Sequence, residues 1–208
     1  MNMVEPAGSV LEEQKDYTGA KLGMWLFLLS EILLFGGMFI LYSAYRYKNP
    51  VDFHHASGEL DVILGTLNTF ILLTSSLTMA ISISAIQRGD RKLSSYLLAA
   101  TIFFGLLFLL NKGIEWGVKI NHGIYPNSLV LLARTKGEIL FFGLYYAMTG
   151  LHGLHVLVGV VVLSAMLRLV LRKRINQTHF VSLENAGLYW HLVDIIWIFL
   201  FPLFYLIT

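Results

Sequence analysis

Seven ionisable side chains lie inside long apolar stretches of this sequence, where charged groups are costly and usually have a function. They are Glu31, Lys112, Glu115, His152, His155, His191 and Asp194. Imidazole and carboxyl groups can carry protons, and both can bind metal ions. These groups could therefore transfer protons, bind a metal or haem, or form hydrogen bonds between helices.

The distances along the sequence between these side chains indicate which of them can act together. His152 and His155 are three residues apart and should share one helix face, as should His191 and Asp194. An aspartate one turn from a histidine can accept its N–H and fix its tautomer. A metal or haem site would need imidazoles facing each other across two helices. The sequence contains no cysteine, so a thiolate site is excluded, and packing is favoured over metal binding.

Glu31 lies nine residues into its apolar stretch, which places it about 14 Å deep at a rise of about 1.5 Å per residue. A carboxylate near the membrane midplane pays a large desolvation cost, so we expect the acid to be mostly protonated. It could hydrogen-bond a neighbouring helix, handle protons or face lipid. Lys112 and Glu115 lie near the end of their stretch. We expect an interfacial pair there, with Lys112 extending toward water.

The amino-acid composition of the chain indicates that these groups lie in a membrane protein. The chain has 208 residues, of which 56% are hydrophobic and 13% charged, and its mean hydropathy is +0.68. Soluble domains contain about 25% charged residues. The low charge content excludes a disordered chain, a nucleic-acid-binding domain and an ordinary soluble enzyme, so no nucleic-acid partner is expected.

Five apolar stretches are each longer than the roughly 20 residues that cross a bilayer as a helix. They cover about 22–45, 63–86, 94–118, 138–168 and 186–207. Only helices satisfy their backbone groups within such segments. We therefore predict an all-α, polytopic membrane bundle of five transmembrane helices over 21–208, preceded by a polar N-terminal tail at 1–20.

Basic residues predict that the N-terminus is inside and the C-terminus outside. Nine lie on the proposed inner side: Lys15, Lys21, Arg88, Arg91, Lys92, Arg168, Arg172, Lys173 and Arg174. Six lie on the other: Arg46, Lys48, Lys112, Lys119, Arg134 and Lys136. The basic residues of the short loops 88–92 and 172–174 give the strongest evidence for this orientation. Their residues Arg88, Arg91, Lys92, Arg172, Lys173 and Arg174 are candidates for binding lipid head groups.

The second stretch is unusually rich in hydroxyl groups. They belong to Thr66, Thr69, Thr74, Ser75, Ser76, Thr78, Ser82 and Ser84. Such residues permit close helix approach and hydrogen bonds between helices. A hydrophilic transport path is the alternative, but the sequence lacks the interrupted apolar segments typical of transporter sites.

Four segments together resemble subunit III of the haem–copper terminal oxidases. They are LSEILLFGG (29–37), LNTFILLTSS (67–76), GLHGLHVLVG (150–159) and LYWHLVDIIWIFLF (188–201). The resemblance extends from about residue 20 to the end and is to the short, five-helix bacterial form. It implies that Glu31 matches the buried, carbodiimide-reactive carboxylate of the family. His152, His155, His191, Asp194, Glu115 and Glu184 match other recurring family positions.

The resemblance also implies a function and partners. Subunit III is non-catalytic, and the haems and copper lie in partner subunits, so this chain should contain no cofactor beyond bound phospholipid. It should pack mainly against subunit I, with subunit II nearby, and support the stability of subunit I and its proton uptake in a bacterial inner membrane. The electron donor would be cytochrome c, or alternatively quinol. An accessory membrane protein of a nitric oxide reductase is a further alternative.

Overall fold

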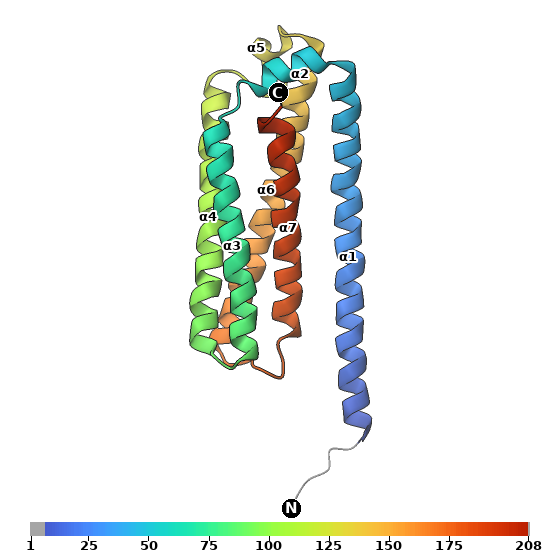
Figure 1. Cartoon of the computed structure of the whole chain (residues 1–208), viewed down its shortest axis with the longest axis vertical. Helices are drawn as coiled ribbons and strands as arrows, with labels where there is room; N and C mark the ends of the chain where they lie inside the picture. The colour runs from blue at the N-terminus through green and yellow to red at the C-terminus, as the bar shows by residue number, and fades with distance from the viewer. Residues whose placement is uncertain (1–6, 208) are drawn as a thin grey trace, which may run out of the picture.

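A computed structural model describes residues 7–207 of the chain, with side chains from residue 18 onward. Five long helices run side by side along the molecule (Figure 1). Their bounds are α1 Ala7–Lys48, α3 Val62–Gln87, α4 Arg91–Asn121, α6 Lys136–Leu171 and α7 Val181–Tyr205. Within the described range there is no strand. Each of these helices is long and apolar enough to span a membrane, which confirms the predicted all-α polytopic bundle.

Polar caps place several helix starts just outside the apolar stretches. The Asp61 side chain accepts from the backbone N–H groups of Ile63 and Leu64 at the start of α3. Asp90 caps α4 and Thr135 caps α6 in the same way, and each cap satisfies N–H groups that a helix start leaves free. These three helices therefore begin one to three residues before the predicted spans, whereas α7 ends at Tyr205, two residues before its predicted end. Residues 7–20 of the expected tail are helical and continue into α1.

Two short helices were not predicted. They are α2 Pro50–Ser57 and α5 Leu129–Leu132, and both lie at the end of the bundle where α1 finishes (Figure 1). Phe53 and Ala56 of α2 are fully buried, so α2 closes this end of the core. The turn between α3 and α4 and the loop between α6 and α7 lie at the opposite end, which we call the basic end.

Four helices form a closed ring around one core. The helix α3 packs against α4, α4 against α6, α6 against α7, and α7 returns to α3. Trp190 and Trp197 are the largest of its fully buried side chains. Their indole N–H groups donate to Ser75 Oγ at 3.1 Å and Thr69 Oγ1 at 3.0 Å. Several hydroxyl groups of α3 thus hydrogen-bond neighbouring helices, whereas those of Thr66 and Thr74 bond within α3 itself.

The first helix stands beside this ring and contacts it along one narrow seam. Leu28, Phe35 and Tyr42 are buried at intervals of seven residues, and Met24 and Met38 flank them against the same core. This heptad spacing is typical of helices that pack with a slight left-handed twist. Tyr42 also donates its hydroxyl hydrogen to the Leu203 carbonyl. The remaining circumference of α1 is exposed, with Ile40 at 73%.

The fit around Trp190 supplies a first testable prediction. A Cβ atom at Gly159 would lie 2.7 Å from Trp190 Cε3, and one at Gly105 would lie 2.7 Å from its Cη2. We expect Gly159→Ala to destabilise the bundle by about 1–3 kcal/mol, the usual cost of overpacking a core. Thermal unfolding in detergent measures it.

Gly143→Ala is the matched control, because a Cβ at this position of the same helix meets no atom within 4 Å. The control should be neutral or slightly stabilising, since alanine favours helix over glycine. Equal stability of the two variants would contradict the packing of Trp190 against Gly159.

Candidate functional site

Glu31 forms a polar link between α1 and the ring. Its Oε2 lies 2.9 Å from Nε2 of His155 on α6, and the two side chains are 14% and 15% exposed. His155 Nδ1 lies 2.8 Å from the Leu151 carbonyl oxygen. Tyr189 of α7 donates to the His155 carbonyl at 3.0 Å. The link therefore joins three helices.

The Leu151 carbonyl determines how many protons this link contains. A carbonyl oxygen can only accept a hydrogen bond, so His155 Nδ1 must carry a hydrogen. The contact between His155 Nε2 and Glu31 then contains one proton, which lies on the imidazole or on the carboxyl group. In both arrangements the pair has no net charge, which lowers the cost of placing it inside a membrane.

His152 faces a different part of the bundle, although it lies one turn from His155. Its ring is fully buried and packs against Phe108 and Trp197 at centroid distances of 5.5 and 5.3 Å. Neither ring nitrogen has a hydrogen-bond partner among the described residues. The two histidines are offset by about 60° around α6, so they share a broad face but contact different neighbouring helices.

The structure gives His191 a partner on another helix. His191 Nδ1 lies 2.8 Å from Ser76 Oγ on α3. Asp194 is 2% exposed, and the same Ser76 hydroxyl also interacts with its carboxyl group. A hydroxyl on the neighbouring helix thus contacts the imidazole in place of the aspartate. In the described part of the chain, no three His, Cys, Asp or Glu side chains are placed to hold a metal ion.

Lys112 does not extend toward water, which corrects the interfacial interpretation. Its side chain is 7% exposed, and its Nζ lies 3.0 Å from Glu115 Oε2. It also donates to the hydroxyl oxygens of Tyr145, at 3.1 Å, and Tyr205. Both tyrosines donate in turn to Glu115 Oε1, at 2.7 and 2.6 Å. Lysine turns inward here because the core supplies a carboxylate and two hydroxyl groups.

The faces of three aromatic rings surround the same ammonium group. Lys112 Nζ lies 5.0 Å from the ring centroids of Tyr145 and Tyr205 and 5.2 Å from that of Trp197. Such contacts add an electrostatic attraction between the cation and the rings. We call Lys112, Glu115, Tyr145 and Tyr205 the buried charge network. It ties α4 to α6 and α7.

The sequence analysis missed both tyrosines. Tyr145 lies seven residues before His152, on the inward face of α6, so helical periodicity could have indicated it. Tyr205 lies on a different helix, and no spacing in the sequence relates it to Lys112. A second missed contact joins two connections between helices, because Arg134, between α5 and α6, pairs with Glu59, between α2 and α3. This hydrogen bond raises the pKa of the Arg134 guanidinium above its ordinary value.

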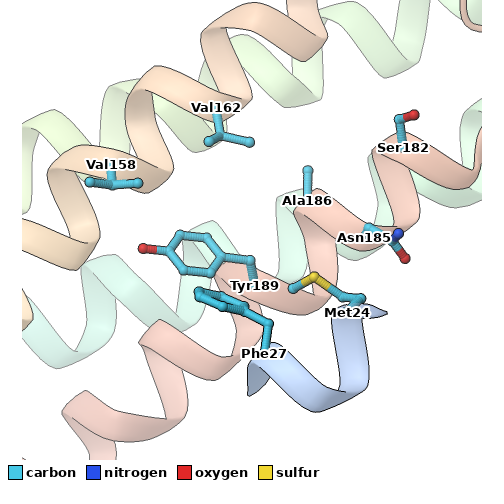
Figure 2. A pocket seen from close by; sticks show the side chains of 8 residues that line it. All are labelled: Met24, Phe27, Val158, Val162, Ser182, Asn185, Ala186 and Tyr189. Carbon is cyan, nitrogen blue, oxygen red and sulfur yellow. The ribbon is translucent and has the colours of Figure 1, made fainter. Parts of the chain in front are cut away.

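Glu184 lies at the basic end, where it forms an ion pair with Lys21 at 2.6 Å. Beyond it, an apolar groove of about 390 Å³ separates α1 from α6 and α7. Figure 2 shows Met24 and Phe27 of α1 beside Tyr189 of α7, with Val158 and Val162 of α6 opposite. Ser182, Asn185 and Tyr189 line it with amide or hydroxyl groups, and Ser182 and Asn185 lie near the start of α7, toward the basic end.

Comparison with known proteins places this bundle in a family. The family described as Cytochrome c oxidase subunit III matches residues 11–208. A cytochrome c oxidase subunit 3 of Synechocystis is 33% identical, over 89% of this chain and 74% of the relative. That of Allomyces macrogynus is 33% identical over 88% of this chain, which spans 64% of the relative's length.

A third relative is named Heme-copper oxidase subunit I+III and comes from Aeropyrum pernix. It is 30% identical over 88% of this chain, which matches 22% of the relative. The family match covers all five long helices as well as the positions of Glu31, Lys112, His155 and Asp194. The chain therefore belongs to the cytochrome c oxidase subunit III family, as the resemblance in its sequence indicated.

Proposed function

We propose that this chain is the non-catalytic subunit III of a proton-pumping haem–copper terminal oxidase that reduces oxygen to water. The observation that carries the proposal is the family match over residues 11–208. The haems and copper would lie in the partner subunits, with cytochrome c as the electron donor. This multi-pass membrane protein would belong to a bacterial inner membrane, with the basic end facing the cytoplasm.

Subunit I would be the main partner, with subunit II nearby. Support comes from the Aeropyrum relative, whose printed name joins subunits I and III in one protein. The chain offers large apolar surfaces for such contacts, since α1 buries only a narrow seam. By packing against subunit I, this chain would stabilise it during turnover and support proton uptake at the basic end.

A bound phospholipid would occupy the groove between α1, α6 and α7. The groove is lined almost wholly by apolar side chains (Figure 2), which suits an acyl chain. Ser182 and Asn185 line the groove near the start of α7, toward the basic end, so a head group would contact them. The Lys21–Glu184 ion pair lies at the same end.

Purification through an affinity tag on this chain tests the assignment. We expect haem and copper absorption bands, co-purifying larger subunits, and oxygen uptake with reduced cytochrome c. Membranes that carry the untagged chain provide the background. If only quinol supports oxygen uptake, the electron donor is quinol and not cytochrome c. Haem bound by this chain alone, or nitric oxide reduction without oxygen uptake, would overturn it.

A further inference from the structure

A second cavity opens at the basic end, away from the apolar groove. It measures about 560 Å³ and is lined by residues of the α3–α4 turn together with the start of the α6–α7 loop. Its lining includes the cationic side chains of Arg91, Lys92 and Lys173. Asp90 is the acidic side chain in the lining, and it is engaged as the cap of α4, accepting from Leu93 N at 3.0 Å. We call this cavity the basic pocket.

Two helix endings of the same kind build the basic pocket. At the end of α3, Gly89 has φ +82°, and Asp90 N donates to the Ala85 carbonyl at 2.9 Å. At the end of α6, Lys173 has φ +61°, and Arg174 N donates to the Leu169 carbonyl at 3.0 Å. Both are Schellman endings, in which one residue adopts the left-handed conformation.

The residue types at these two left-handed positions differ. Glycine adopts this conformation freely, whereas a residue with a side chain there stores roughly 1–3 kcal/mol of strain. The chain has glycine at the first position, Gly89, and lysine at the second, Lys173. Strained residues cluster at functional sites. The left-handed turn at Lys173 thus places this lysine among the residues that line the basic pocket.

Arg91 supplies an unused hydrogen-bond donor beside this charge. Its Nε is buried and has no hydrogen-bond partner in the described part of the chain. Arg91 also lines an adjoining cavity of about 110 Å³ with Asn176 and Gln177. A Cβ atom on Gly89 would lie 2.6 Å from Gln177 Nε2, so the two loops are in close contact. Arg91 and Gly89 thus line both cavities, which places the two loops side by side at this site.

We infer that the basic pocket binds a phosphate group. Guanidinium groups bind phosphate oxygens through paired N–H donors, and lysines add point charges. The exposed side chains of Arg88, Arg172 and Arg174 in the same loops strengthen the positive field. The phosphate belongs to an anionic lipid head group or to a soluble phosphate. This inference does not depend on the oxidase assignment.

Binding to the purified complex in nanodiscs tests the inference. The probes are phosphatidylglycerol, with phosphatidylcholine as its neutral counterpart, and inorganic phosphate added to lipid-depleted protein. Lys173→Gly removes the charge and relieves the backbone strain, so the variant should fold at least as stably as the wild type. We expect its phosphatidylglycerol affinity to fall about fivefold, the effect of losing one basic contact at a membrane surface.

Lys136→Gln is the matched control, because Lys136 is an exposed cation at the opposite end of α6. It should bind as the wild type does. A preference for phosphatidylglycerol identifies a lipid head group, whereas saturable stabilisation by inorganic phosphate identifies a soluble ligand. Equal affinities of wild type and Lys173→Gly for both probes overturn the inference, as does an equal loss in Lys136→Gln.

Discussion

Lys112→Met is expected to destabilise the bundle by about 3–5 kcal/mol, because it removes one partner of a buried ion pair. The Glu115 carboxylate would keep its bonds from Tyr145 and Tyr205 but lose its only counter-charge within hydrogen-bonding distance among the described residues. Inside a membrane bundle, water cannot replace that charge. The measurement is the thermal unfolding of the purified protein in detergent, with the yield of assembled complex as a second readout.

Lys21→Met is the control, since Lys21 forms an ion pair of similar length with Glu184. That pair is about one-fifth exposed on each side, and exposed pairs contribute about 0–1 kcal/mol. The double variant Lys112→Met/Glu115→Gln should recover part of the loss, because no unpaired charge then remains. Equal effects of Lys112→Met and Lys21→Met would show that the buried charge network does not stabilise the bundle.

The five long helices could be predicted because one physical requirement dominates them. Apolar runs such as 63–86 must satisfy their backbone groups within the segment when they lie in lipid. The helices α2 and α5 escaped prediction for the opposite reason, since they lie outside those runs. Pro50 begins α2 and Phe53 anchors it, but eight residues of mixed polarity do not reveal a helix on their own.

The candidate site was predicted less well, because a residue's type and depth do not fix the direction of its side chain. The sequence identified Glu31 and His155 but gave no sign that they meet across α1 and α6. For Lys112, the expectation of snorkelling assumed that water was the nearest polar surrounding. Tyr145 and Tyr205 are nearer, and only the arrangement of α6 and α7 brings them there.

The basic loops show where a sequence pattern and the structure agree. Charge counting grouped Arg91, Lys92 and Lys173 on one side of the membrane, and the structure brings them to one cavity. The pattern could not show that Lys173 occupies a left-handed position. That feature arises from how α6 ends. A count of charges along the sequence carries no information on this backbone conformation.

Glu31 is part of the contact that attaches α1 to the ring. This helix packs less extensively against the ring than the four ring helices pack against each other. The seam of Leu28, Phe35 and Tyr42 is apolar apart from the Tyr42 hydroxyl group. The link from Glu31 to His155 lies between Leu28 and Phe35 and fixes how α1 is positioned along α6. We therefore expect Glu31 to hold α1 against α6 through this contact.

If the chain acts as the proposed oxidase subunit, Glu31→Gln should leave the initial rate of oxygen uptake unchanged. The glutamine amide can donate to His155 Nε2 while His155 Nδ1 continues to donate to Leu151. Glu31→Leu leaves that buried nitrogen without a partner, at a cost of about 1–3 kcal/mol. This loosens α1, so the complex should start at the normal rate but inactivate after fewer turnovers.

Oxygen uptake by the purified complex, followed over many turnovers, measures both quantities for wild type, Glu31→Gln and Glu31→Leu. Ser30→Ala serves as a control, because Ser30 bonds only within its own helix, to the Phe27 carbonyl at 2.7 Å. Its rate and working life should match those of the wild type. Suppose instead that Glu31→Gln abolishes the initial rate while the complex remains assembled and its haem spectrum is intact. Glu31 would then carry a proton that turnover requires, and its role could not be attachment alone.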